Sequence, residues 1–416
     1  MPDMHESTVA VLTAGGAAAL HAPYQQEAAS GIELAVGEGM VWLSDLRLPR
    51  RVKVGGVACV PVSLDNGNDA AKVAVVAADG RLVTARIPTA FRTARRIRSG
   101  EREVTFTYGE MIYWVGETAL RHEGSELPIG STATRLADDR MRAFIGAALV
   151  EALHLAGFAP GAYTLALAVA IPDSEVEDGD DAKDLNRLSV RADTSKALMK
   201  YLRKQTLTVT REGKSGEQRW ELTIGPMLTQ PQTSGTINLY TKAPNGKTVI
   251  DRDRLIVLNI GGGDTFQSEV STNPFQMSSE RISAGTVEIA RALWRGLGEQ
   301  EQNDAAAQYA LRTRRALIDG RWTDIGAQVD TVMREVGQTL TTRVLATVLT
   351  SRRFALITGG GLHQIGAQID ARMAEAQPPR VKGKSYDVIN GNLSSVANAL
   401  GALFTLLIAT AARKGS

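Results

Sequence analysis

Two stretches, LIVLNIGGGDT (residues 255–265) and FALITGGGLHQIGAQI (residues 354–369), decide the fold of this chain. In each, a mainly apolar run typical of a buried strand ends in three consecutive glycines. Helical patterns follow at residues 282–297 and 325–349, and again directly after the second glycine run. Strands that alternate with helices predict an α/β fold, whose ligands bind at the carboxyl ends of the strands.

A third glycine-containing loop lies earlier, in SLDNGNDAAK (residues 63–72). Its Asn-Gly pair separates apolar runs at residues 57–64 and 72–78, which predicts a tight β-hairpin. Glycines let backbone N–H groups approach an anion, a lysine neutralises phosphate, and a carboxylate holds hydrated Mg²⁺. One such loop is more typical of a simple turn, but the three loops together predict a nucleotide site.

The apolar pattern predicts further elements around these loops. Residues 163–171 form a continuous apolar run typical of a buried strand, and residues 140–157 have the spacing of a helix. Residues 81–87 and 104–115 predict two more strands. The most apolar segment, residues 396–412, is shorter than the ~20 residues that span a membrane, so we expect a buried helix there and no membrane contact.

Composition narrows the class of protein. A length of 416 residues predicts two or three domains, and a mean hydropathy of −0.10 is typical of a soluble globular chain. The net charge is only +2, so direct binding to nucleic acid is not expected. A single cysteine excludes an intrachain disulfide framework, and the first residues lack a secretory signal, so we expect a cytoplasmic location.

Other catalytic motifs are missing from the sequence. Gly246-Lys247-Thr248 and Gly383-Lys384-Ser385 both lack the first glycine of a Walker loop. The sequence contains neither His-Glu-x-x-His nor Gly-x-Ser-x-Gly. These observations argue against a P-loop NTPase, a zinc protease and an α/β-hydrolase.

The three loops, in this order, resemble those of the actin, Hsp70 and sugar-kinase ATPase superfamily, and most closely those of bacterial actin-like proteins of the ParM/StbA plasmid-segregation type. The resemblance runs from about residue 60 to the C-terminus and leaves residues 1–52 outside. The matching segments are 63–72 (first phosphate hairpin), 148–172 (helix and strand before a proline), 255–265 (second phosphate hairpin), 282–293 (helix start under the nucleotide), 354–369 (adenosine loop) and 385–391 (closing Tyr-Asp-x-x-Asn-Gly segment).

This resemblance implies an actin-like, ribonuclease H-like α/β fold of two domains around a central nucleotide cleft. Domain I would hold residues 53–250 and the returning C-terminal helix, residues 386–416. Domain II would hold residues 251–385. Residues 1–52 would be an N-terminal extension whose role the sequence does not indicate.

The resemblance also implies ATP or GTP, with Mg²⁺, as cofactors. The metal would lie near Asp65 and Asp264. The residues expected to bind the nucleotide are Asp65, Gly67, Asn68, Lys72, Gly261, Gly262, Gly263, Asp264, Gly285, Gly359, Gly360, Gly361 and Leu362.

Two positions depart from the family pattern. Asn259 stands where the second phosphate hairpin of the family begins with an aspartate, and Gln230 best matches the catalytic glutamate, with Gln232 as the other candidate. An amide neither accepts a proton nor neutralises a cation. The implied catalytic set is therefore Asp65, Gln230 and Asn259, and we expect ATP hydrolysis to be slow.

The resemblance implies a cytoskeletal filament, a homopolymer that segregates plasmid or other DNA through a DNA-binding adaptor protein. The alternative is a nucleotide-binding pseudoenzyme that does not polymerise and binds a partner through its N-terminal extension. A chaperone of the Hsp70 type would carry a substrate domain after the ATPase fold. The resemblance covers the ATPase fold alone, so we rank this function last. A sugar kinase would require a catalytic aspartate, for which the sequence offers no convincing candidate.

Overall fold

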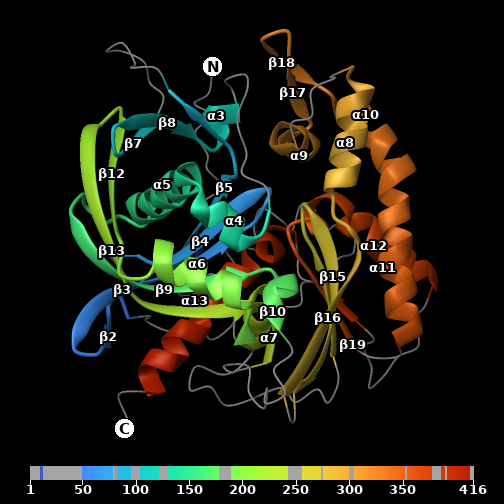
Figure 1. The fold of residues 1–416 in the computed structure, drawn as a ribbon. Coiled ribbons are helices and arrows are strands. Elements are labelled where there is room, and N and C mark those ends of the chain that lie inside the picture. Colours follow the sequence, from blue (N-terminus) through green and yellow to red (C-terminus); the bar gives the residue numbers. More distant parts are fainter. Residues whose placement is uncertain are drawn as a thin grey trace.

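The chain forms two lobes, each built around one β-sheet (Figure 1). We call the part around the 11-stranded sheet the first lobe and the part around the 5-stranded sheet the second lobe. The computed structural model describes residues 10–12, 49–77, 80, 82–94, 104–120, 130–177, 189–241, 255–272, 275–298, 304–351, 354–376, 386–388 and 391–412. Most of the predicted extension, residues 1–52, lies outside the described residues.

Three parallel strands form the centre of the first sheet: β3 (Val57–Asn66), β9 (Ala162–Ile171) and β13 (Gly216–Pro231). Beyond β3, the antiparallel strands β4 (Ala70–Val76) and β5 (Leu82–Pro88) continue the sheet. The remaining strands are β12 (Thr206–Gly213), β7 (Thr105–Tyr108), β8 (Met111–Val115) and β6 (Phe91–Thr93) beyond β13, β2 (Val52–Val54) beside β3, and β1 (Ala10–Leu12) beside β5.

The second sheet repeats the central arrangement of the first. Its order is β16-β15-β14-β19-β20, and β14 is antiparallel to β15 and parallel to β19. The order β5-β4-β3-β9-β13 in the first sheet has the same directions. Each lobe therefore has a hairpin turn at the carboxyl end of its central strand. The bounds are β14 (Leu255–Ile260), β15 (Asp264–Thr272), β16 (Phe275–Ala284), β19 (Phe354–Thr358) and β20 (Tyr386–Val388).

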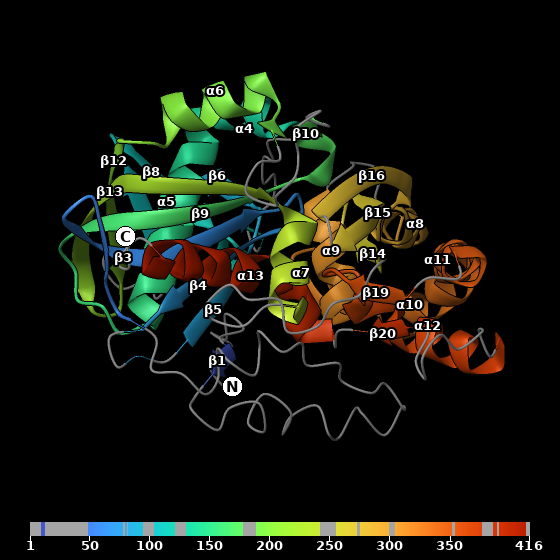
Figure 2. The ribbon, with the colours of Figure 1, turned by 90° about the horizontal axis from the view of Figure 1, so that it is seen from below.

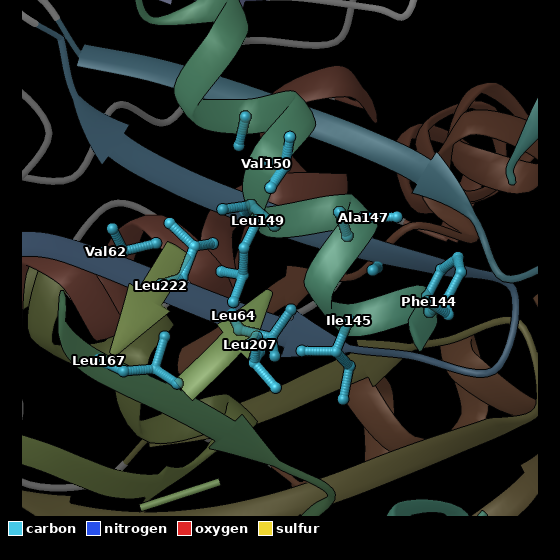
Figure 3. Packing of buried hydrophobic residues seen from close by; sticks show 14 of the residues in the cluster. Val62, Leu64, Phe144, Ile145, Ala147, Leu149, Val150, Leu167, Leu207 and Leu222 are labelled. Atoms are coloured by element: carbon cyan, nitrogen blue, oxygen red, sulfur yellow. The ribbon is translucent and has the colours of Figure 1, made fainter. Parts of the chain in front are cut away.

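Helix α5 (Asp139–Leu155) forms the core of the first lobe together with the sheet (Figure 3). Its Phe144, Ile145 and Leu149 are fully buried in one cluster with Leu64 of β3 and Leu222 of β13. Burying each such side chain contributes about 1.5–3 kcal/mol. Strands β3 and β9 are covered on one face by α5 and on the other by helix α13 (Gly391–Ala412). Because both faces are buried, both strands have continuous apolar sequences.

The other helices and short strands surround the two sheets. The first lobe adds α3 (Glu117–Leu120), α4 (Thr132–Ala137), a 3₁₀ turn (Asp173–Glu175), α6 (Ala192–Tyr201), β10 (Val176–Glu177) and β11 (Ser189–Val190). The second lobe adds α8 (Val287–Gly296), α9 (Asp304–Thr313), β17 (Arg315–Ile318), β18 (Arg321–Asp324), α10 (Gly326–Val332), a π-helical turn (Met333–Gly337), α11 (Gln338–Ser351) and α12 (Leu362–Ala376).

Two helices cross between the lobes. Helix α7 (Gln232–Thr241) follows the last strand of the first sheet, and α13 follows the last strand of the second and returns to pack on the first lobe (Figure 2). They meet at Gly235 and Gly401, where a Cβ atom on Gly401 would clash with the backbone oxygen of Gly235. Thr236 Oγ1 donates to Asn398 Oδ1 at 2.8 Å beside this contact. The crossing therefore depends on two glycines.

The structure confirms the predicted α/β class and corrects two elements. The strand predicted at residues 104–115 is two strands, because Gly109 adopts a φ of +61° and turns the chain back. The helix predicted at 282–297 begins at Val287, since the preceding residues pair with β15 as the end of β16. None of the helices in the described part is long and apolar enough to cross a membrane. The predicted domain boundaries stay a prediction.

Gly401→Ala is expected to lower the free energy of unfolding by about 1–3 kcal/mol, because the added methyl group forces α13 away from α7. Gly296→Ala is the matched control: it also adds a methyl group to a helix, but no atom lies within 4 Å of the new Cβ. The control is expected to be neutral or slightly stabilising. Urea denaturation of both variants checks this, and equal losses would contradict a close crossing.

Candidate functional site

A cavity of about 390 Å³ opens where the two hairpin turns meet. Its lining includes both turns, Gly360 from the third glycine loop, and Gln232 at the start of α7. Ser395 and Asn398 of α13 complete it from the side of the helix crossing. The cavity thus collects residues from all three loops that the sequence singled out, which lie far apart along the chain.

The first hairpin brings a buried lysine between two carboxylates. Lys72 Nζ lies 3.5 Å from Asp65 Oδ2 and 3.4 Å from Asp69 Oδ1. Asp65 is 1% exposed, and its Oδ1 accepts a hydrogen bond from Gln232 Nε2 at 2.6 Å. A Cβ on Gly67 would come within 2.6 Å of Lys72 Nζ and 2.9 Å of the Ala70 carbonyl oxygen, and the backbone contact makes glycine the residue that fits this turn.

Asp69 places a negative charge inside the turn, and three cations compensate for it. Arg86 Nη2 donates to Asp69 Oδ2 at 2.6 Å, in addition to the contact with Lys72. Burial alone would raise the pKa of Asp69, but Lys72, Arg86 and Arg312 outweigh burial and hold this pKa well below its usual range. Arg312 comes from α9 of the second lobe. Asp69 therefore stays ionised and links the first hairpin electrostatically to the second lobe.

The second hairpin is held by the residues that precede α8. Gly261 N–H closes the turn on the Asp264 carbonyl at 2.8 Å. The N–H groups of Gly285, Thr286 and Val287 donate to the carbonyls of Gly263, Gly261 and Gly262 at 2.9, 3.1 and 2.7 Å. Gly285 thus supports the turn from behind. Asp264 lines the cavity, and its carboxylate pairs with Arg281.

The two turns are in direct contact. A Cβ on Gly262 would lie 2.8 Å from the Cβ of Asp69, and a Cβ on Gly263 would lie 3.1 Å from Asn68 Nδ2. A side chain at Gly262 would therefore push the hairpins apart, whereas one at Gly263 would require a small shift of the Asn68 side chain. Gly262 is therefore required for the approach of the two lobes.

The third loop contributes Gly360 to the cavity. Gly359 has a φ of +106°, and a Cβ there would lie 2.7 Å from Asn259 Oδ1. Gly361 N–H donates to the Ile260 carbonyl at 2.8 Å, and Leu362 N–H donates to the Gly359 carbonyl at 3.2 Å as α12 begins. Gly359, Gly361 and Leu362 are not in the described lining; they fix the loop against β14. Asn259 is in the lining and is 5% exposed.

The two glutamines considered at the catalytic position have different surroundings. Gln232 lines the cavity and bonds to Asp65. Gln230 lies near the end of β13, outside the described lining, and its buried Nε2 has no hydrogen-bond partner among the described residues. The geometry favours Gln232 for this position, and a catalytic role for either glutamine stays a prediction.

Arg135 and Glu175 are among the cavity residues that sequence reasoning missed. Arg135 of α4 is 3% exposed and donates to the carbonyls of Asn66 and Gly67 at 2.7 and 3.1 Å. Glu175 accepts from the backbone N–H of Thr132 at 2.7 Å and so holds the start of α4. Asp69, by contrast, could be recognised from the sequence, because it lies within the predicted hairpin. Neither Arg135 nor Glu175 belongs to a motif, because both reach the site through tertiary packing.

Burial lowers the pKa of Arg135 to about 10, while Glu175, Asp65 and Asp69 act to raise it. The guanidinium therefore remains charged at neutral pH. It adds a positive charge beside the first hairpin, and such a field favours an anionic ligand.

Asp173 links the end of β9 to α7 and to the second lobe. Its carboxylate accepts from Thr233 Oγ1 at 2.7 Å, from Thr233 N–H at 3.2 Å and from Ser268 Oγ of β15 at 3.4 Å. Burial raises the pKa of Asp173 to about 6, and the nearby charge of Asp65 adds to this effect. The hydrogen bonds oppose the shift without cancelling it.

The carboxylates present suit a magnesium ion that arrives with a nucleotide. No group of three or more histidine, cysteine or acidic side chains is placed to hold a metal ion alone in the part of the chain that the structure describes. Magnesium bound to nucleotide phosphates needs only one or two protein carboxylates. Asp65 meets this requirement, since it lines the cavity beside the turn. Asp264 also lines the cavity; its carboxylate pairs with Arg281, as that of Asp65 pairs with Lys72.

Comparison with known proteins identifies the fold. No protein-family model matches the chain, and no curated protein matches it in sequence. Among solved structures, Ta0583, an archaeal actin homologue in complex with ADP, is similar with a TM-score of 0.56 and 17% identity over 86% of this chain and 100% of that chain.

Two further structures agree with this result. Bacillus thuringiensis ParM with AMPPNP has a TM-score of 0.55 and 12% identity, over 84% of this chain and 99% of that one. The actin-like protein Alp7A has a TM-score of 0.57 and 12% identity, over 85% and 97%. The chain therefore has the actin-like fold over nearly the full length of these proteins.

Asp173→Asn is expected to flatten the dependence of stability on pH. Native Asp173 holds its proton up to about pH 6, whereas an unfolded aspartate releases it near pH 4. The native state therefore binds more protons in this range, and the free energy of unfolding falls by about 1 kcal/mol from pH 5 to 7. Urea denaturation across this range should show the fall in the wild type and not in Asp173→Asn.

Asp193→Asn is the matched control. Asp193 is exposed, and a hydrogen bond from the Thr194 N–H lowers its pKa, so it does not titrate between pH 5 and 7. This control should keep the wild-type pH profile. The assignment of the titration to Asp173 is wrong if Asp173→Asn keeps that profile as well.

Proposed function

We propose that the chain binds ATP or GTP, together with Mg²⁺, in the cavity between its lobes. One observation carries this proposal: the hairpin turns that follow the equivalent central strands, β3 and β14, of the two sheets touch each other at Asp69 and Gly262. Turns of this kind present backbone N–H groups to an anion from two sides. Lys72 supplies a buried positive charge at the same place.

Different residues of the cavity would bind different parts of the nucleotide. The turns around Gly67 and Gly262 would surround the phosphates, with Lys72 as their counter-charge, and the loop at Gly360 would lie against the nucleoside. Asp65 would hold Mg²⁺ through its water shell, and Gln232 would orient the Asp65 carboxylate. When bound, Mg²⁺ neutralises phosphate charge.

We further propose that nucleotide binding favours the closed arrangement of the lobes and that this state polymerises head to tail. Non-closing contacts between identical copies produce filaments, and a ligand that prefers one conformation shifts the population toward it. The likeness in fold to ParM and Alp7A supports such self-assembly. Segregation of plasmid or other DNA would then use a separate DNA-binding adaptor, because a net charge of +2 gives this chain little attraction for DNA.

Hydrolysis would be slow in this site. Asn259 lines the cavity with an amide in place of a carboxylate, and the nearest candidate for orienting water, Gln232, is also an amide. Neither side chain can take a proton from water. The same amides support a second candidate function, a nucleotide-binding pseudoenzyme that does not polymerise and serves as a partner-binding module.

Sedimentation at high speed, with Mg-ATP, with Mg-GTP and without nucleotide, tests the proposal. Pelleting that depends on nucleotide is expected. Gly360→Val is the control: Gly360 lines the cavity and has no atom closer than 3.9 Å to a new Cβ, so valine fills the cavity without a backbone clash. This variant should neither bind nucleotide nor pellet. Binding without pelleting would favour the partner-binding module, and a wild type that binds neither nucleotide would contradict both functions.

Asn259→Asp is expected to raise the rate of phosphate release from ATP by about 10²-fold, because it adds a general base beside the phosphates. A phosphate-release assay measures the rate, and calorimetric titration with ATP confirms that affinity is retained. A rate equal to that of the wild type, with ATP bound, would show that Asn259 does not limit hydrolysis.

A further inference from the structure

The two hairpin turns perform the same task in the two lobes but are supported differently. In the second hairpin, backbone N–H groups of residues 285–287 hold the three glycine carbonyls. The first hairpin has equivalent carbonyls at Asn66 and Gly67. These carbonyls are bound by side chains: Arg135 donates to both, and Thr89 Oγ1 donates to Gly67 O at 2.8 Å.

We propose that Arg135 is a positioning residue for nucleotide phosphates, which acts by holding the first hairpin in its phosphate-binding conformation. This inference rests on the proposed nucleotide site. Arg135 would take over in the first lobe the task that the backbone before α8 performs in the second. Its effect would fall on the phosphate part of the ligand, since all the oxygens that it binds belong to the turn.

Peptide geometry explains how contacts at carbonyls control N–H groups. In a trans peptide the C=O and the following N–H point in opposite directions. Fixing the carbonyls of Asn66 and Gly67 therefore fixes the N–H groups of Gly67 and Asn68. Gly67 N–H closes the turn on the Ala70 carbonyl at 3.1 Å. The Asn68 N–H is held in one orientation at the point where the turn meets Gly263.

A guanidinium is required for this arrangement. Besides the two carbonyls, Arg135 Nη2 donates to Asn66 Oδ1 at 3.2 Å, so one planar group binds three oxygens on two residues. A lysine ammonium is a point charge and does not reproduce this fork. Arg135→Lys therefore keeps the charge and removes the geometry, which separates positioning from simple electrostatic attraction.

Arg142 offers a matched control on the neighbouring helix. Its Nη1 donates to the carbonyls of Leu136 and Ala137 at 2.7 and 3.2 Å, which is the same kind of contact. These carbonyls lie at the end of α4, and Arg142 is outside the described cavity lining. Arg142→Lys should therefore leave nucleotide affinity unchanged.

Calorimetric titration with ATP, ADP and adenosine tests the proposal. Arg135→Lys should weaken ATP and ADP binding by about 10-fold or more and leave adenosine binding unchanged, since charge-assisted hydrogen bonds contribute about 1.5–3 kcal/mol. Thr89→Val, which removes the other donor to Gly67 O, should weaken ATP binding in the same direction. Arg135→Ala should recover ATP affinity when guanidinium is added at tens of millimolar, a rescue that a purely structural defect would not show.

Three outcomes would overturn the inference while leaving the proposed function intact: wild-type ATP affinity in Arg135→Lys, an equal loss for adenosine, or an equal loss in Arg142→Lys. A wild type that binds neither ATP nor GTP would overturn the proposed function itself. Circular dichroism of each variant confirms folding, and Thr89→Val keeps the test decisive where an Arg135 variant does not fold.

Discussion

The close crossing of α7 and α13 at Gly235 and Gly401 is the constraint on which the site depends. Each helix follows the last strand of one sheet, so their contact fixes the ends of both halves of the repeat relative to each other. Gln232 at the start of α7 and Asn398 on α13 both line the cavity. Because interiors are close-packed, a change in the distance between these helices would move the cavity lining on both sides.

The repeat explains why one cavity contains loops so distant in sequence. In both sheets the central strand leads into a hairpin and is flanked by a parallel strand. The carboxyl ends of such strands gather at one edge of a sheet, where ligands bind. When the two edges face each other, the turns at Asp69 and Gly262 come into contact. The geometry of the site therefore follows from applying one local arrangement twice.

Local signals in the sequence predicted most of the strands and the three glycine loops, because alternation, apolar runs and Asn-Gly turns act over a few residues. The actin-like class was implied by the resemblance of these loops to a known family. The local signals failed where contacts between residues distant in the sequence determine the local structure. The apolar spacing at residues 282–297 continues across the end of β16 into α8, and only pairing with β15 separates the two. The difference between Gln230 and Gln232 depends on where β13 ends and α7 begins. Arg135 contacts the hairpin from a helix that carries no motif.

The charges around the cavity also limit which ligands it can bind. The acids beside the first hairpin, Asp65 and Asp69, are matched by Lys72, Arg86 and Arg135, and Arg312 approaches Asp69 from the second lobe. The lining already holds the carboxylates of Asp65, Asp69, Glu175 and Asp264, so an aspartate at position 259 would add a fifth, whereas the asparagine present adds none. Beside the first hairpin, the four cations Lys72, Arg86, Arg135 and Arg312 outnumber the hairpin's own two acids, Asp65 and Asp69. A hairpin surrounded by cations in this way favours an anion, and the electrostatic attraction between Asp69 and Arg312 of the opposite lobe makes closure of the cavity part of the same charge balance.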